Sequence, residues 1–258
     1  MRLFSRKKKN DDDTNPSPSY TDEYNLGRSE HFLWRAEAGA SSIQAVDWVS
    51  KTGVPYLEDV YALYKDEILK LGDANRLPIN VIVKPSSACG GGIAGATGSG
   101  ELSYCAGQWG SNQFCFGIIA HELCNLFTGE RVSGGWPTAW WANHRSPFPT
   151  VIANEAMQRL VPRFYKMWGD YNDPLVVMFD RLYHDYRGMF PRMLQKMREL
   201  RVSLEGVGEP YLSHIIYYFM FYGAGRPVAN YFVVPPMPAI NPSWLGELEA
   251  RYRLGIVV

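Results

Sequence analysis

The stretch GIIAHELCNLFTGE, Gly117–Glu130, decides the fold because it places ionisable residues within an otherwise apolar helical pattern. The helix is predicted to begin at Ser111 or Asn112, either of which can cap it, and to end at Gly129. Apolar side chains recur at helical spacing on one face, which we expect to lie against the core: Phe116, Ile119, Leu123, Leu126 and Phe127.

A second face of this helix carries polar residues. His121 and Asn125 are one helical turn apart, and Glu122 lies beside them. In zinc hydrolases with an HExxH motif, two histidines at this spacing bind the metal, and the glutamate accepts a proton from the metal-bound water. The sequence HELCN supplies the first histidine and the glutamate, and it has asparagine where the second histidine would stand.

A downstream helix adds to this pattern. The segment PTVIANEAMQRLV predicts a helix that carries Glu155 within an Asn-Glu dipeptide. With the strand-like segment before the HELCN helix, this order resembles the gluzincin branch of the zincin metallopeptidases over residues 77–200. The resemblance implies a zinc cofactor, with His121 as the first ligand, Glu122 as the general base and Glu155 as the third ligand.

Asn125 departs from the pattern of that family. Its neutral amide oxygen is a poorer partner for zinc than an imidazole and is better suited to harder cations. We therefore expect Asn125 to be a weak metal ligand. His144, in the loop after the helix, and the thiolate of Cys124 are alternatives that could complete the site.

Other candidate site residues lie further along the chain. His184 and Tyr186, with Tyr183 as an alternative, lie where some gluzincins place a side chain that stabilises the oxyanion. An aromatic loop between the two helices is expected to wall a substrate pocket, through Trp136, Trp140, Trp141, His144 and Arg145. Within this loop, Arg145 could bind a carboxylate or a phosphate. For each of these residues the alternative role is packing of the loop or the core.

Composition limits the classes of partner. The chain has 258 residues, 46% of them hydrophobic, and 26 basic residues balance 26 acidic residues, so no net field attracts nucleic acid or an anionic membrane. Residues 1–27 are rich in charge, Ser and Pro and predict a disordered arm before a single domain at 28–258. No apolar run predicts a secretory signal or an integral membrane segment, and we expect a cytoplasmic protein.

The four cysteines follow no CxxC pattern. In a reducing compartment we expect Cys89, Cys105, Cys115 and Cys124 to be buried thiols. If the chain were exported by another route, Cys89 and Cys105 would be the favoured pair.

The order of predicted elements favours an α+β fold of the zincin type, with a small N-terminal mixed sheet before a mainly helical C-terminal part. Strands are expected within 30–43, 77–85 and 89–109, and helices within 56–72, 111–129, 149–161, 174–200 and 210–225. The glycines of 89–109 fit a GxGxxG spacing, but no helix opens after them. A flexible hairpin or substrate-edge loop is therefore favoured over a phosphate site.

These observations predict a metal-dependent, metallopeptidase-like hydrolase. Its metal-bound water would attack an amide or ester carbonyl of a peptide or small-molecule substrate. One alternative is a catalytically inactive metallopeptidase-like binding protein. Another is an enzyme that uses Glu122 and His121 as acid and base without a metal.

Overall fold

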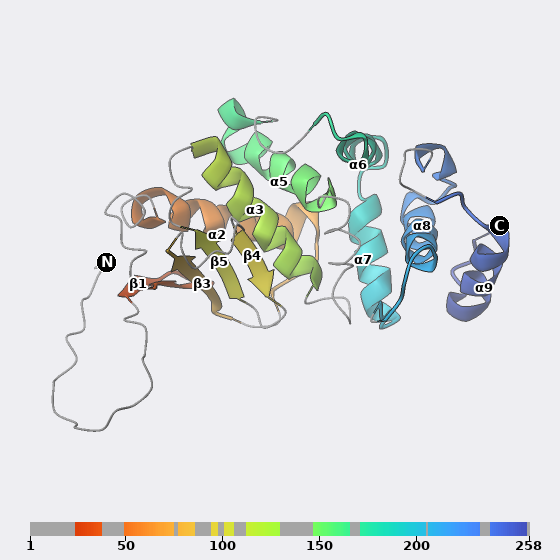
Figure 1. The fold of residues 1–258 in the computed structure, drawn as a ribbon, viewed down its shortest axis with the longest axis horizontal. Coiled ribbons are helices and arrows are strands. Elements are labelled where there is room, and N and C mark those ends of the chain that lie inside the picture. Colours follow the sequence, from red (N-terminus) through yellow and green to blue (C-terminus); the bar gives the residue numbers. More distant parts are fainter. Residues whose placement is uncertain are drawn as a thin grey trace, which may run out of the picture.

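The computed structural model describes residues 24–37, 49–74, 77–85, 94–97, 101–105, 112–129, 147–165, 171–204, 206–232 and 238–256. It confirms the predicted α+β class, since a mixed sheet comes first in the chain and a mostly helical part follows (Figure 1). The first strand begins at Tyr24, so the folded part starts before the predicted boundary at Arg28.

The sheet has five strands in the order β1-β2-β3-β5-β4. Strands β2, β3 and β5 are parallel, and β1 and β4 pair antiparallel to their neighbours at the two edges. Alternate residues of β2 are buried, which is the pattern of a strand with one face on the core. The strands are Tyr24–Arg28 (β1), Phe32–Ala36 (β2), Ile79–Lys84 (β3), Ala94–Thr97 (β4) and Glu101–Cys105 (β5).

One strand of the sheet ends in a disulfide-bonded cysteine. Cys105, at the end of β5, is disulfide-bonded, whereas Cys115 and Cys124 are free and buried. The expectation of four buried thiols is therefore wrong at Cys105. Cys89, the partner that the sequence favoured for Cys105 in an exported protein, lies outside the described residues.

The helix between β2 and β3 is irregular. The sequence predicts one helix up to Gly72, but α2 (Val54–Leu63) lies between two π-helical segments, η1 (Val49–Gly53) and η2 (Tyr64–Ile68). A π-helical turn contains more residues than an α-helical turn, so it changes which side chains face a neighbouring element. Tyr64 and Ile68 of η2 are both buried.

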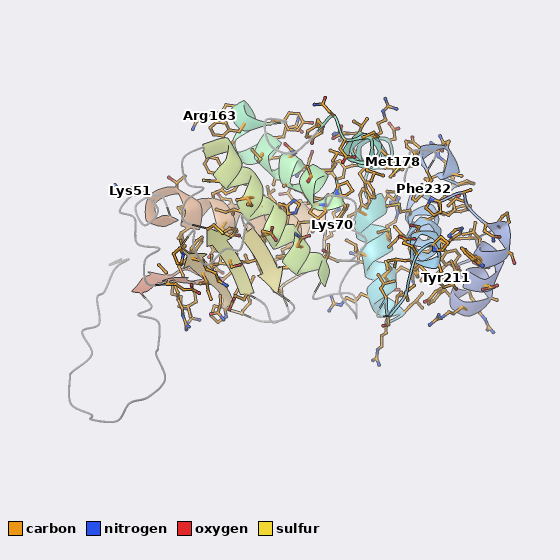
Figure 2. The ribbon with its side chains drawn as sticks, in the orientation of Figure 1. Lys51, Lys70, Arg163, Met178, Tyr211 and Phe232 are labelled. Atoms are coloured by element: carbon orange, nitrogen blue, oxygen red, sulfur yellow. The ribbon has the colours of Figure 1, made fainter. Side chains whose placement is uncertain are left out.

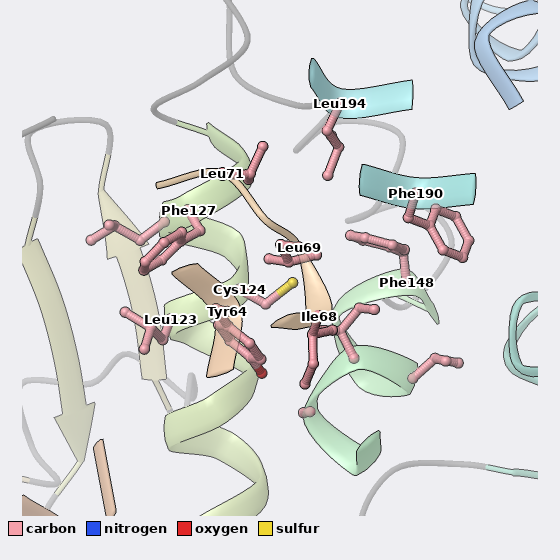
Figure 3. Packing of buried hydrophobic residues seen from close by; sticks show 14 of the residues in the cluster. Tyr64, Ile68, Leu69, Leu71, Leu123, Cys124, Phe127, Phe148, Phe190 and Leu194 are labelled. Atoms are coloured by element: carbon pink, nitrogen blue, oxygen red, sulfur yellow. The ribbon is translucent and has the colours of Figure 1, made fainter. Parts of the chain in front are cut away.

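The helix that carries the HELCN sequence is α3 (Asn112–Gly129), and both of its ends agree with the prediction. It packs against β4, β5 and α2, and α5 (Pro147–Leu160) lies along it. Buried side chains from η2, α3 and α5, including Tyr64, Phe127 and Phe148, meet in one cluster (Figure 3). The core therefore fixes α3 on several sides.

The remaining helices form the C-terminal part (Figure 1). One helix predicted across 174–200 is two, because Gly188 adopts a left-handed conformation with φ +82° and breaks the run. A last helix, α9, was missed by the sequence pattern. The bounds are Pro174–Asp185 (α6), Met189–Glu199 (α7), Tyr211–Ala224 (α8) and Pro242–Tyr252 (α9), with short 3-10 turns at Pro162–Phe164 and Ala229–Tyr231.

Side chains pack closely between these C-terminal helices, where Tyr211 and Phe232 lie (Figure 2). Helix α8 is apolar on nearly all sides, and α7 and α9 both pack against it. Helices α7 and α8 approach closely at Gly223 of α8, where a Cβ atom would lie 2.5 Å from the carbonyl oxygen of Met189. No helix in the described ranges is both long enough and apolar enough to cross a membrane.

Candidate functional site

The candidate site begins on the open face of α3. Ile118, His121 and Asn125 are half-buried, whereas every other residue from Cys115 to Thr128 is buried. These positions are three and four residues apart, which places them on one side of an α-helix. The predicted polar face is therefore confirmed, and Glu122 lies at its edge.

Glu122 is held within this face by its neighbour one turn away. The Asn125 side-chain Nδ2 donates a hydrogen bond of 3.1 Å to the Glu122 carboxylate, which is 9% exposed. Burial raises the pKa of Glu122 to about 7, and the Asn125 bond offsets part of this rise. At neutral pH the carboxyl group can therefore both accept and release a proton.

His121 is neutral over the whole physiological pH range. Burial lowers the pKa of its imidazole to about 3, and its Nδ1 atom is buried. A neutral imidazole offers one nitrogen lone pair, which can bind a metal or accept a hydrogen bond from water. His121 and Glu122 thus have pKa values pushed in opposite directions on adjacent positions, a pattern that is common in acid–base sites.

Two buried tyrosines fix the turn before these residues, and the sequence reasoning missed them. The Tyr64 hydroxyl donates a 2.9 Å hydrogen bond to the Ala120 carbonyl, and the Tyr104 hydroxyl donates one of 3.5 Å to the Ile119 carbonyl. Tyr64 comes from η2 and Tyr104 from β5, so the bonds tie α3 to both neighbouring elements. The sequence predicted a helix within 56–72, which includes Tyr64, but helical spacing carries no information about which atom accepts a hydrogen bond from a tyrosine hydroxyl.

Glu155, the predicted third zinc ligand, has a different partner. Arg159 donates two hydrogen bonds to its Oε1, of 2.9 Å from Nε and 2.7 Å from Nη2, and its Nη1 lies 2.8 Å from Glu67 of η2. Burial raises the pKa of Tyr183 on α6, and the nearby charge of Glu155 raises it further. The ion pairs of Arg159 link α5 to η2 and balance the charge of Glu155.

The described residues do not form a zinc site. Protein zinc sites use three or four protein ligands. His121 fits that role, but the Asn125 amide is bonded to Glu122 and the Glu155 carboxylate to Arg159. Across the described ranges, no three His, Cys, Asp or Glu side chains lie close enough together to hold a metal ion. The zinc cofactor therefore stays a prediction, and it would need ligands from outside the described residues.

Three other candidates lie away from the open face of α3. Cys124 is fully buried beside Tyr64 in the core (Figure 3), and burial raises the pKa of its thiol, which disfavours a thiolate ligand. His184 is half exposed and lies 3.6 Å from Asp180, and the ring of Tyr186 packs on Tyr231. Neither His184 nor Tyr186 forms a hydrogen bond, ion pair or ring contact with a described residue of α3.

The proposed substrate-binding residues fall in 130–146, between α3 and α5, and lie outside the described residues. They are Trp136, Trp140, Trp141, His144 and Arg145. Their predicted roles, including that of His144 as an additional ligand, stay predictions.

Comparisons with known proteins identify no family. No protein-family model matches the chain, and no curated protein matches it. One similar solved structure is a functionally unknown conserved protein mutant from Bacillus anthracis str. Ames, with 13% sequence identity and a TM-score of 0.49. The alignment covers 93% of this chain and 52% of that one, so the chain spans about half the length of the protein it matches. A likeness at this level gives no basis for transferring a function.

Proposed function

We propose that this protein is a metallopeptidase-like hydrolase that attacks an amide or ester carbonyl, with Glu122 as its general base. The observation that carries the proposal is a buried carboxyl group with a pKa near 7, at the edge of the open face of α3 and hydrogen-bonded to Asn125. An acid–base catalyst works best when its pKa lies near the working pH, because both of its protonation states are then available.

The proposed proton transfers need only residues of α3. The carboxylate of Glu122 takes a proton from the attacking water, and the protonated group then returns it to the leaving group. Asn125 holds the carboxyl group in place through its 3.1 Å hydrogen bond. His121 stays neutral and presents a nitrogen lone pair beside the reaction.

Zinc would polarise the carbonyl and lower the pKa of the attacking water when bound. His121 is the described residue that would hold it. Because Asn125 and Glu155 are engaged by Glu122 and Arg159, the described residues do not complete a zinc site, and no step above depends on the metal.

The neighbouring sheet edge favours an extended peptide as the substrate. Strand β4 pairs with β5 on one side and lies at the edge of the sheet, next to α3. The free side of an edge strand presents unpaired backbone groups, to which an extended peptide can add by main-chain hydrogen bonds. Such a peptide would pass beside the helix that carries Glu122.

The test is a comparison of Glu122→Gln with wild type on fluorogenic peptide and ester substrates. Glutamine keeps the size of the side chain but cannot accept the proton, so we expect kcat to fall at least about 100-fold. Glu67→Gln is the matched control, because Glu67 is an exposed glutamate in the Arg159 network, and it should retain wild-type activity. Metal content is measured in the same samples, and activity is assayed with a chelator and after zinc is added back.

Each result has a clear meaning. Activity that survives in Glu122→Gln would rule out Glu122 as the base. Activity that a chelator removes and zinc restores would require ligands beyond the described residues, and Asn125→His should then tighten zinc binding. If wild type cleaves no substrate in either assay, the hydrolase proposal fails.

A second candidate is a binding protein without catalysis. It is favoured by the partners of Asn125 and Glu155, since both positions that would bind zinc serve hydrogen bonds within the protein. Under this alternative, Asn125 and Glu122 of α3 form a hydrogen bond with each other, Glu155 and Arg159 of α5 do the same, and neither pair binds a metal. Zinc would then change neither the thermal stability of wild type nor that of Asn125→His.

A further inference from the structure

A buried histidine joins the last two helices. His214 of α8 is 1% exposed, and its Nδ1 lies 2.9 Å from the carbonyl oxygen of Pro210. The backbone N–H of Asn241 donates to His214 Nε2 at 2.7 Å. The ring of Trp244 in α9 meets the imidazole edge to face, with centroids 4.6 Å apart.

These partners fix the protonation state of the imidazole. A carbonyl oxygen can only accept a hydrogen bond, so Nδ1 must carry the proton. A backbone N–H can only donate, so Nε2 must have a free lone pair. His214 is therefore neutral in this arrangement, and a proton on Nε2 would place two donors against each other.

The bond to Asn241 holds the start of α9. Asn241 caps this helix, since its side-chain Oδ1 accepts a 3.0 Å hydrogen bond from the Ser243 N–H. Trp244, in the first turn of α9, packs on His214 and on Tyr211. The cap and first turn of α9 are thus anchored to α8 through one titratable ring.

We propose that His214 is an acid-sensitive latch, and that its protonation releases the first turn of α9 from α8. The latch stands independently of the proposed hydrolase activity.

Among the described residues, no carboxylate near the latch compensates a charge on His214. Glu209, one turn before it, accepts hydrogen bonds from the Ser213 backbone N–H and hydroxyl. In α9, Glu247 is exposed, and Glu249 accepts from the Tyr218 hydroxyl at 2.7 Å. His214 forms no ion pair within the described part of the chain, so a buried imidazolium here would be unbalanced.

Acid weakens the other end of α9 as well. Burial raises the pKa of Glu249, but hydrogen bonds from Tyr218 and from the backbone N–H groups of Ile256 and Gly255 outweigh it and lower the pKa. The carboxylate form of Glu249 therefore holds residues 254–256 against α8 and α9. Its protonation would remove acceptors from these groups, but only below the ordinary glutamate pKa of 4.5, so Glu249 does not contribute to a change between pH 7.5 and pH 5.

The test is hydrogen exchange of the Asn241 amide and the first turn of α9 between pH 7.5 and pH 5, corrected for intrinsic exchange rates. In wild type, the protection should fall with decreasing pH, by up to about tenfold per pH unit. In His214→Gln, whose side chain can accept the Asn241 N–H without titrating, this fall should be absent. His184→Gln removes an exposed histidine of α6 and should behave as wild type.

An equal fall in wild type and His214→Gln, or no fall in wild type, would overturn the proposal. If His214→Gln does not fold, nitrogen NMR of the wild-type imidazole decides the question. The proposal expects the Nδ1–H tautomer at neutral pH and a change of the Asn241 amide signal that follows the ring titration. A ring that titrates while the Asn241 protection stays constant would also overturn it.

Discussion

At the residue scale, Glu122 makes the stability of the fold depend on pH. Its folded pKa of about 7 lies above the unfolded value of 4.5, so the folded protein binds the proton more tightly. Stability from this group is fully present below the unfolded pKa and is lost as pH rises through the folded value. The difference corresponds to a loss of about 3 kcal/mol.

Glu122→Gln should remove this loss and be more stable than wild type above pH 7. The measurement is urea unfolding of both proteins between pH 4 and pH 8, with the free-energy difference plotted against pH. Taking the difference is necessary because His121, with its lowered pKa, changes stability in the opposite direction as pH falls. If the difference in unfolding free energy between the two proteins does not vary with pH, the pKa of Glu122 is not raised in the folded state.

The residues of α3 also show what the sequence could and could not predict. Helical spacing correctly placed His121, Glu122 and Asn125 on one face, because this face follows from the period of the helix. The partners of the polar groups were not predictable. The bond from Arg159 to Glu155 competes with a role in metal binding, and no local pattern indicates which of the two a glutamate adopts.

At the element scale, the contact between α7 and α8 depends on one glycine. A Cβ at Gly223 would lie 2.5 Å from the Met189 carbonyl oxygen, which is backbone and can move only with the helix. Gly223→Ala should therefore cost about 1–3 kcal/mol of unfolding free energy, despite the better helix propensity of alanine.

Gly246 of α9 provides the matched control for this substitution. It is also a helical glycine, but no atom lies within 4 Å of the position of its Cβ. Gly246→Ala should stabilise the protein by roughly 0.5–1 kcal/mol. Chemical denaturation of both variants tests the pair, and equal effects would show that the close approach at Gly223 does not constrain the fold.

Helix boundaries were predicted unevenly for physical reasons. The ends of α3 were recognised because a capping residue and a terminal glycine mark them. The break between α6 and α7 was missed, although Gly188 marks it, because the apolar spacing continues on both sides. Helix α9 was missed because only Leu245 and Leu248 of its residues are buried, which leaves a weak pattern.

At the scale of the whole molecule, the state of the cysteines predicts how many thiols react with a reagent before and after reduction. Cys115 and Cys124 are free and Cys105 is disulfide-bonded. With the pairing of Cys89 and Cys105 that the sequence favours for an exported protein, the chain purified without reductant and then denatured should show two reactive thiols, and after reduction it should show four. Four thiols before reduction would mean that no disulfide forms under those conditions.

The α+β class followed from the order of elements along the chain, because most strands come before most helices and do not alternate with them. The pairing of strands within the sheet could be predicted only in part. The antiparallel pairing of β4 with β5 agrees with the hairpin predicted within 89–109. The parallel pairing of β3 with β5, which joins Asn80 to Glu101, was not predicted, because strand patterns carry no information about distant neighbours.

The position of β5 between β3 and β4 has a consequence for the chain as it leaves the ribosome. Strand β4 emerges before β5, and β5 is its partner in the sheet as well as that of β3. The antiparallel edge must therefore wait until Cys105 has been synthesised, and its core face is covered only when α3 follows. During translation the unpaired strand can therefore pair with another nascent chain until β5 and α3 have been synthesised.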